Sequence, residues 1–148
     1  MSKAVLIDKM HSLLDEKINT INTTISSIKE SRDSDTKSSA GDKYETGRAM
    51  AQIELDNTKR QLSVTQNLKN ELNRVSIEKV FKTVSFGSLV KTSQANYFLS
   101  IGLGEVKMNE ETYYCVSSVS PIGQVLLGKK AGETVNFRSN PITILELI

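Results

Sequence analysis

Two carboxylates near the first third of the chain have the spacing that could do chemistry. Asp42 and Glu45 stand three residues apart within the stretch Gly-Asp-Lys-Tyr-Glu-Thr-Gly-Arg at residues 41–48. If a helix begins at Asp42, both side chains lie on one face, about 5 to 6 Å apart at Cβ, and they can share one divalent cation. The same letters also spell an N-terminal capping box, in which Asp42 accepts from the first-turn amides and Glu45 folds back. Taken alone, the spacing favours the cap, because such caps are common.

The composition limits the size of the core and the class of partner. The chain has 148 residues, enough for one ordinary domain or two small ones. Hydrophobic residues make up 38% and tryptophan is absent, so we expect a modest core. Residues 1–76 carry 12 basic and 11 acidic side chains and residues 77–148 carry 7 and 6, which leaves a net charge of +1 on each part. Such an even distribution argues against a protein that grips nucleic acid mainly by neutralising phosphates.

Histidine and cysteine are too few for several common kinds of site. Cys115 is the sole cysteine, which excludes an internal disulfide and a thiolate metal cluster, and its apolar neighbours predict a core position. With His11 as the sole histidine, no nucleophilic pair or triad is available. No apolar run reaches the roughly 20 residues of a spanning helix, and the N-terminus lacks a signal-peptide pattern. We therefore expect a cytoplasmic protein without membrane contact.

Helical periodicity occurs on both sides of the carboxylates. Between residues 4 and 28, large apolar residues recur at intervals of three and four, which predicts a coiled-coil seam. The pattern resumes at Ala51 and continues to Val75, with Thr58 and Thr65 at intermediate places on the seam. The large apolar residues of the two runs are Ile7, Met10, Leu14, Ile18, Ile21, Ile25, Ile28, Leu55, Leu62, Leu68, Leu72 and Val75.

The segment between these runs has no large apolar side chain from residue 31 to residue 40, which predicts a loop. Two helices of similar length joined by a short polar loop indicate an antiparallel hairpin over residues 1–76, with its tip near 31–48. Gly47 destabilises a helix by about 1 kcal/mol relative to alanine. Its presence therefore indicates that this segment has a role other than structural stability. The basic residues of the second helix predict a solvated face, with RNA contact as an alternative: Lys59, Arg60, Lys69 and Arg74.

After Val75 the pattern changes to a period of two and a β-rich composition. Ser120 and Pro121 predict the start of a short helix, which Gly128 closes. We therefore predict a small β-rich domain with one short helix at residues 77–148, and an α+β protein overall. The predicted strands are Val80–Val90, Tyr97–Leu103, Thr112–Val119, Thr134–Arg138 and Ile142–Leu147.

Two motifs together resemble a known family. The stretch Gly41-Asp42-Lys43-Tyr44-Glu45 is similar to the Gly-Asp-x-x-Glu tip of the Gre family of bacterial transcript-cleavage factors, GreA and GreB. The second motif, Ser120-Pro121-Ile122-Gly123 followed by Leu-Leu-Gly-Lys-Lys-Ala-Gly at residues 126–132, resembles the Ser-Pro-Ile-x-x-x-Leu-Leu-Gly-Lys-x-x-Gly signature of that family. The second motif is the more specific, and the resemblance covers nearly the whole chain.

The resemblance implies a transcription elongation factor that binds RNA polymerase. The helical hairpin would enter the secondary channel of the polymerase, while the C-terminal domain, similar to FK506-binding (FKBP) domains, docks at the channel rim through Ser120, Pro121, Ile122 and Gly123. Asp42 and Glu45 would help to hold a Mg²⁺ ion shared with the polymerase and so stimulate its own cleavage of backtracked RNA. The chain would then be no enzyme by itself and would need no cofactor of its own. Contact with the transcript RNA would be weak or indirect, and we expect a monomer, with self-association as the alternative.

Some residues depart from the family pattern. After Glu45 the cleavage factors usually continue Asn-Ala-Glu-Tyr, whereas this chain has Thr46-Gly47-Arg48-Ala49 and so lacks an acidic side chain. Val119 stands before Ser120, where a rim-contacting acidic residue is found in the family. Some Gre-like proteins inhibit the polymerase instead, and Asp33 and Asp35 are candidates for acidic groups of that kind. We rank activation slightly above inhibition.

Two other classes of function stay open. In a scaffold protein the hairpin would mediate self-association, and Asp42 and Glu45 would be caps. A prolyl isomerase is a second alternative, suggested by the FKBP-like domain. A shared fold is weak evidence for a shared activity, because one fold supports many functions. Several of the aromatic residues that would have to line a proline pocket must instead fill the core: Phe81, Phe86, Tyr97, Phe98, Tyr113, Tyr114 and Phe137.

Overall fold

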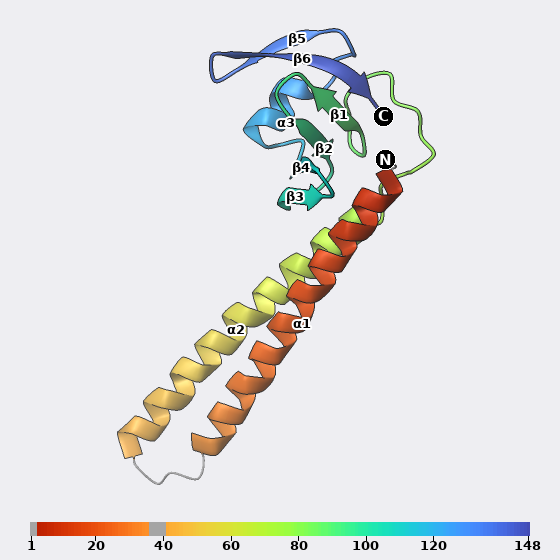
Figure 1. Ribbon diagram of the computed structural model, residues 1–148. Coiled ribbons are helices and arrows are strands. Elements are labelled where there is room, and N and C mark those ends of the chain that lie inside the picture. The colour runs from red at the N-terminus through yellow and green to blue at the C-terminus, as the bar shows by residue number, and fades with distance from the viewer. Residues whose placement is uncertain (1–2, 36–40) are drawn as a thin grey trace. The chain divides into compact units, whose positions relative to one another are not determined.

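The predicted α+β class is confirmed. The structure, a computed structural model, describes residues 3–35 and 41–148, with the backbone alone at residues 34, 35 and 41–44. Two long helices, α1 (Lys3–Asp35) and α2 (Gly41–Leu72), precede a six-stranded sheet that carries one short helix, α3 (Pro121–Leu126) (Figure 1). The strands are β1 (Leu89–Thr92), β2 (Asn96–Leu99), β3 (Gly104–Met108), β4 (Glu111–Val116), β5 (Thr134–Phe137) and β6 (Asn140–Leu147).

The chain forms two compact units. The helical unit consists of Ser12–Lys69, and the sheet unit consists of Asn70–Ile148 together with the start of α1 up to His11. The first residues of α1 therefore belong to the sheet unit, although the helix continues without a break into the helical unit.

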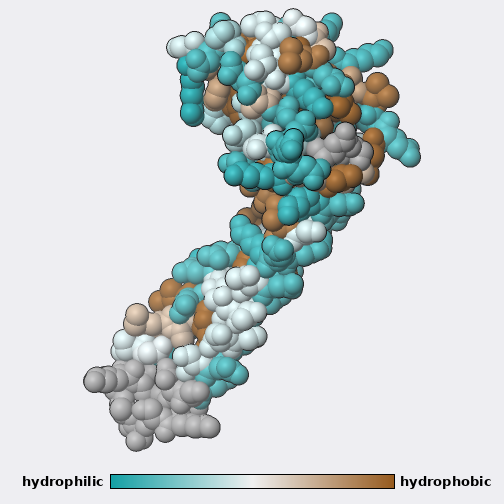
Figure 2. All heavy atoms as spheres, viewed as in Figure 1, coloured by the Kyte–Doolittle hydropathy of each residue, from teal (hydrophilic) through white to brown (hydrophobic). Residues whose placement is uncertain are grey.

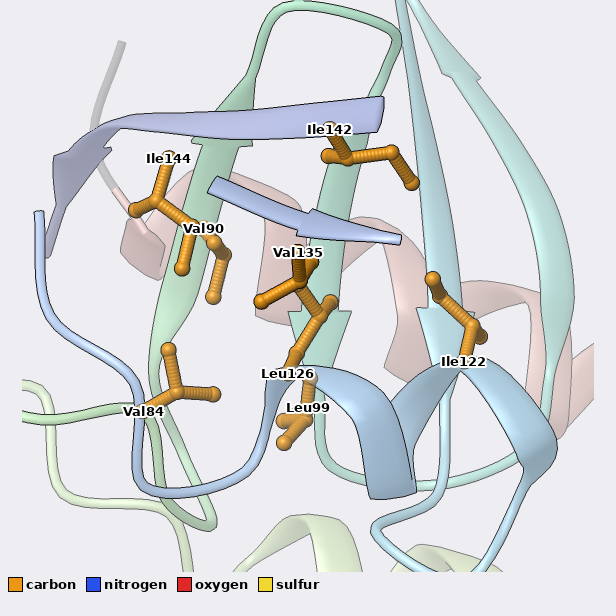
Figure 3. Close-up of a cluster of buried hydrophobic side chains, with 8 residues drawn as sticks. All are labelled: Val84, Val90, Leu99, Ile122, Leu126, Val135, Ile142 and Ile144. Carbon is orange, nitrogen blue, oxygen red and sulfur yellow. The ribbon is translucent and has the colours of Figure 1, made fainter. Parts of the chain in front are cut away.

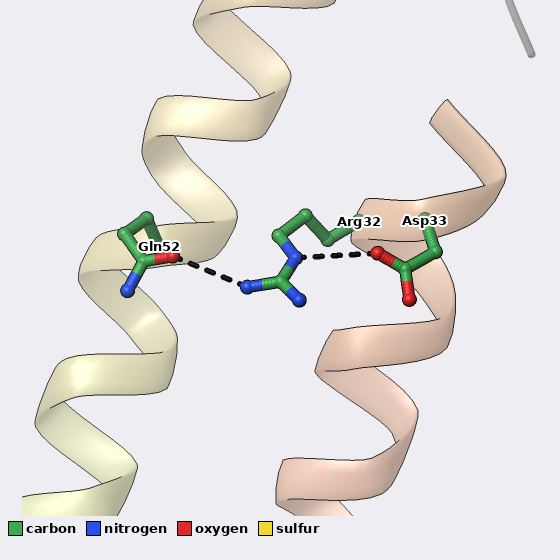
Figure 4. A network of polar contacts seen from close by, with 3 residues as sticks. All are labelled: Arg32, Asp33 and Gln52. Carbon is green, nitrogen blue, oxygen red and sulfur yellow. Dashed lines mark hydrogen bonds and ion pairs between the residues drawn. The ribbon is translucent and has the colours of Figure 1, made fainter. Parts of the chain in front are cut away.

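The two helices of the helical unit run antiparallel. Asp15 of α1 forms an ion pair with Lys69 of α2, and further along Arg32 Nη1 donates to Gln52 Oε1 at 3.3 Å (Figure 4). The residue numbers of each pair add to 84, so the register stays constant over about 17 residues of each helix. The predicted hairpin is therefore present, and its α1 end at Asp35 and its α2 start at Gly41 lie at the same end of the helical unit.

The seam between the helices holds the residues that the sequence pattern predicts. Ile21, Ile25 and Ile28 of α1 pack with Leu55 of α2 in one buried cluster. Thr58 and Thr65 are buried as predicted, and each hydroxyl donates to the carbonyl four residues earlier at 2.8 Å. Because threonine contributes less apolar surface than leucine, each turn of α2 buries little.

Both helices extend beyond their apolar repeats. The predicted loop begins too early, because α1 continues to Asp35. The second helix begins at Gly41, one residue before the start considered at Asp42 and well before the apolar repeat resumes at Ala51. An apolar repeat reports which turns are buried, whereas a helix that has nucleated adds each further residue cheaply, without needing an apolar partner. The part of the predicted loop at residues 36–40 lies outside the described residues.

The sheet has the order β3-β4-β2-β1-β6-β5, in which only β2 and β4 are parallel. The predicted strand Val80–Val90 is wrong, because residues 77–88 are irregular and β1 begins at Leu89. Val84 instead exchanges backbone hydrogen bonds with the segment after α3, donating to Lys129 O and accepting from Gly128 N, both at 2.8 Å. Phe81 and Val84 are therefore buried without joining a regular strand, whereas Val80 is exposed.

Strand β3 was not predicted. It pairs antiparallel with β4 through a tight turn in which Asn109 has a positive φ of 53°. The predicted bend at Asn140-Pro141 is also misplaced, because β6 begins at Asn140 and the turn falls on Arg138 and Ser139, both with positive φ. Such two-residue turns with positive φ join antiparallel strands directly.

The core of the sheet unit lies between α3 and one face of the sheet. Its side chains come from β1, β2, β5, β6, α3 and the segment before β1, and they converge in Figure 3. They are Val84, Val90, Leu99, Ile122, Leu126, Val135, Ile142 and Ile144.

The opposite face of the sheet packs on the start of α1. Cys115 Sγ lies 3.6 Å from Met10 Sδ, and both side chains are buried. Burial raises the pKa of the Cys115 thiol to about 12. The predicted core position of Cys115 is therefore confirmed, and its thiol is held in an unreactive state.

Candidate functional site

The tip of the hairpin contains the two predicted carboxylates. Helix α2 begins at Gly41, so Asp42 and Glu45 lie within its first turns, and their spacing of three residues places them on one helical face. Glu45 is exposed, while the side chain of Asp42 lies outside the described residues. The capping-box interpretation stays an alternative, because it depends on the side chain of Asp42.

The start of α2 favours negative charge. The first backbone amides of a helix have no partner within it and carry a partial positive charge, so carboxylates in the first turn are stabilised there. Among the described residues, no group of three or more histidine, cysteine, aspartate or glutamate side chains is arranged to hold a metal ion.

Near the tip, the described residues also include an exposed acidic side chain and the lining of a shallow hollow. Asp33, near the end of α1, is exposed and forms an ion pair with Arg32 at 3.4 Å (Figure 4). The side chain of Asp35 lies outside the described residues. Gly47 lines a shallow hollow with Met50 and Ile53, two large apolar side chains that are both exposed.

The predicted docking motif first of all builds the turn into α3. Ser120 is the N-cap: its Oγ accepts from Gly123 N at 3.1 Å and donates to Ser117 O at 2.7 Å. Pro121 is the first helical residue and Ile122 is buried in the core. A Cβ atom added to Gly123 would lie 2.2 Å from Ser117 O, which explains the need for glycine.

The exposed part of this motif is apolar. Pro121 is exposed, and so is Val119 just before the cap, with 80% of its surface accessible. Leu127, directly after α3, is also exposed. From the sequence, Val119 stood out only as a departure from the family pattern and Leu127 only as a member of the second motif, and neither was predicted to be an exposed apolar contact.

Lys3 is a buried charged residue that the sequence analysis missed. Its side chain is 4% exposed, its Nζ donates to Gly87 O at 2.9 Å, and it lies 4.5 Å from the centre of the Phe81 ring. Lys79 Nζ lies 5.0 Å from the centre of the same ring. Burial lowers the pKa of Lys3. No periodicity indicates such a role, because an N-terminal lysine is ordinarily solvated.

Several of the aromatic residues lie in the core of the sheet unit. Phe81, Phe98 and Tyr113 are buried, in line with the expectation that several aromatic rings fill the core. Tyr97 and Tyr114 form a pair whose ring centres lie 5.9 Å apart across the parallel strands β2 and β4. Tyr97 itself packs against the main cluster of the sheet unit.

Comparisons with known proteins give matches among solved structures. No protein-family model and no curated protein matches the chain. The chain is similar to GreA factor homolog 1 (Gfh1) of Thermus thermophilus, with 16% identity over 93% of each chain and a TM-score of 0.36. It is similar to Gfh1 of Thermus aquaticus, with 14% identity over 95% of this chain and 94% of that one and a TM-score of 0.35. A structure described as the transcription factor Gfh1 shows 15% identity over 99% and 95%, with a TM-score of 0.35. At these scores the likeness assigns no function to this chain.

No helix within the described residues is long and apolar enough to cross a membrane.

Proposed function

We propose that this protein is a cytoplasmic transcription elongation factor that binds RNA polymerase and inserts its hairpin tip into the secondary channel. There Asp42 and Glu45 would assist the polymerase in cleaving backtracked RNA. One observation carries the proposal: the antiparallel hairpin has Asp42 and Glu45 at its end, with Glu45 exposed. The resemblance of the tip and of the Ser-Pro-Ile-Gly motif to the Gre family supports the same function.

The length of the hairpin suits delivery of a group into a narrow space. Within the helical unit, α1 runs from Ser12 to Asp35, and 24 residues of helix extend about 36 Å. Two packed helices form a thin rod, and the ion pair between Asp15 and Lys69 lies at the opposite end from the carboxylates. A rod of this kind can reach a site that a globular domain cannot enter.

The chemistry of the donor set fits Mg²⁺. This ion commonly takes one or two protein carboxylates and keeps other places for water and phosphate oxygens. Asp42 and Glu45 are the residues that would hold it. In a phosphodiester hydrolysis with two metals, the ions activate the attacking water and stabilise the leaving oxygen. The contribution of this chain is to hold two negative charges on one helical face, and exclusion of water from a channel strengthens their interaction with a cation.

In this proposal the protein hydrolyses nothing by itself. Two carboxylates lack the further ligands that a complete site needs, so the catalytic centre belongs to the polymerase. The protein needs no cofactor of its own, because the Mg²⁺ ion is shared. Contact with the transcript is indirect or weak, and the tip acts on the metal site rather than on a base.

The motif around α3 is the proposed docking element of the sheet unit. Ser120 and Gly123 shape the turn through their mutual hydrogen bond, and Ile122 anchors it in the core. Pro121 and Val119 are then the exposed groups that a partner surface can touch. We assign Ser120, Ile122 and Gly123 to positioning the docking surface and Pro121 to direct contact.

Inhibition of polymerase without cleavage is the second candidate. It is favoured by the exposed Asp33 on the last turns of α1 and by Arg48, which stands near the carboxylates where the Gre pattern has an acidic residue. An added acidic group can hold a metal ion in a geometry that is wrong for cleavage.

Stalled, backtracked polymerase complexes separate these functions. We expect the wild type to shorten the transcript and Asp42→Asn/Glu45→Gln to reduce the cleavage rate at least about tenfold, because the shared ion loses both carboxylates. Glu16→Gln is the control, since it removes an exposed carboxylate from α1 away from the tip. Competition for polymerase without shortening would establish the inhibitor, and Asp33→Asn should then relieve inhibition. No effect of the wild type on polymerase would contradict both candidates and favour the scaffold.

A further inference from the structure

A second surface lies on the middle of the hairpin, well away from the tip. Two shallow hollows of about 540 and 330 Å³ lie beside each other on α2 and share Arg60 and Val64 in their linings. Lys59 lines the first, and Lys17 of α1 lines the second. We call Lys17, Lys59, Arg60 and Val64 the mid-hairpin patch.

Val64 is exposed without a structural reason. It follows Leu62 of the seam by two residues, or about 200° around the helix, so it points away from α1. It is 60% exposed and lines both hollows. On the face seen in Figure 2, the hairpin surface is hydrophilic or intermediate over most of its described part, with a few hydrophobic residues between. An apolar side chain between two hollows offers a partner a contact that the hairpin itself does not use.

The charges around Val64 are predominantly positive. Lys17 and Lys59 form no ion pair in the described part of the chain, and Arg60 donates only to the neutral Asn57 Oδ1, at 2.9 Å. Asp56 is the single acidic residue lining either hollow, and it already accepts from Gln52 Nε2 at 3.0 Å. Three cations therefore face one carboxylate, and the patch is complementary to an acidic surface.

The patch fits a polypeptide better than RNA. Proteins that hold single-stranded nucleic acid combine basic residues with aromatic side chains on which bases stack. No phenylalanine, tyrosine or tryptophan lines either hollow, and the exposed aliphatic group is central. Protein interfaces combine an apolar centre with charged residues at the rim, which is the arrangement of Val64 among three cations.

We propose that the mid-hairpin patch docks an acidic surface of RNA polymerase that presents an apolar side chain to Val64. The inference rests on the proposed function, since it names the second place at which the inserted hairpin meets the polymerase. Val64 lies 19 residues after Glu45 on the same helix, or about 28 Å along its axis. Binding at the patch and chemistry at the tip are therefore separable by mutation.

The experiment measures affinity for core RNA polymerase and, separately, for a single-stranded RNA, using the full chain. Lys59→Gln/Arg60→Gln and Val64→Ser test the charges and the apolar contact, with circular dichroism to check the helices. Val64→Ile keeps an aliphatic group and is the control for Val64→Ser. Lys9→Gln/Arg74→Gln removes two exposed cations elsewhere and is the control for charge.

We expect Lys59→Gln/Arg60→Gln and Val64→Ser each to weaken polymerase binding about tenfold, and both controls to bind within about twofold of the wild type. The difference in affinity between the wild type and Lys59→Gln/Arg60→Gln should be smaller at high salt, because salt screens the attraction between these cations and an acidic partner. The proposal would be overturned if Lys59→Gln/Arg60→Gln lowered the affinity for polymerase and for RNA while Val64→Ser kept wild-type affinity for polymerase. That result would assign the patch to RNA. Wild-type affinity in both variants would overturn it as well. If the wild type fails to bind polymerase, the proposed function fails and this inference fails with it, an outcome distinct from a patch without effect.

Discussion

The helical unit and the sheet unit are stabilised in different ways. The seam of the hairpin alternates aliphatic residues with Thr58 and Thr65, and both long helices leave most of their surface in solvent. The core of the sheet unit gathers aliphatic side chains from six segments that lie far apart in the chain. Burial per residue is therefore low in the hairpin and high in the sheet unit. The comparison suggests that the hairpin is selected for reach and the sheet unit for stability.

The largest expected effect comes from truncating one leucine in each of the two units. Leu126→Ala removes a fully buried side chain of α3, and we expect a loss of about 3 to 4 kcal/mol in the free energy of unfolding. Leu62→Ala removes a half-buried side chain of the seam, with an expected loss of about 1 to 2 kcal/mol. Urea unfolding followed by circular dichroism measures both. Equal losses would show that the seam is packed as tightly as the sheet core.

A second test compares two glycines of the sheet unit. Gly123→Ala forces a methyl group into the carbonyl of Ser117, and we expect about 2 to 3 kcal/mol of destabilisation from the shift of the turn. Gly102→Ala meets no atom within 4 Å, so its effect should stay within about 0.5 kcal/mol. Thermal unfolding of both variants gives the difference. A tolerated Gly123→Ala would mean that the turn into α3 is not tightly packed.

The buried Lys3 makes the stability of the sheet unit depend on pH. Its pKa is lowered in the folded protein, so below its usual value of 10.5 there is a pH range in which only the unfolded chain holds the proton. Stability therefore increases as pH rises through that range. Lys3→Met keeps the contact with Phe81 and should remove this dependence. The difference between wild type and variant is the useful quantity, because the pKa of Tyr113, raised to about 12, acts in the opposite sense. Above pH 10 the folded protein keeps a tyrosine proton that the unfolded chain loses, so this contribution to stability decreases as pH rises toward about 12.

The smallest expected effect is a gain of stability in the seam. Thr58→Val and Thr65→Val replace buried hydroxyls by methyl groups, and each should stabilise the hairpin by less than about 1 kcal/mol. Thr20→Val is the control, because Thr20 makes the same bond to a carbonyl four residues earlier but is exposed. Slower hydrogen exchange of α2 amides in the seam variants alone is the expected result. A loss of stability would show that the hydroxyls are preferred to apolar contact.

The sequence determined the local features of this protein. Ile21, Ile25, Ile28 and Leu55 follow from periodicity alone, because the repeat of a helix is written in neighbouring residues. The turn at Ser120 and Pro121 follows likewise from the chemistry of a helix start. The spacing of Asp42 and Glu45 also marked the tip as a candidate site, and their role stays a prediction.

Tertiary structure decided the features that depend on distant partners. Residues 77–88 alternate as a strand does, yet Val84 bonds to Gly128 and Lys129, more than 40 residues later, instead of joining a regular strand. The burial of Lys3 depends on Gly87 and Phe81 in the same way. Periodicity reports which side chains are to be buried, but the backbone partner and the covering residues are chosen by the packing of the whole unit, and that choice is not encoded in any short stretch of the chain.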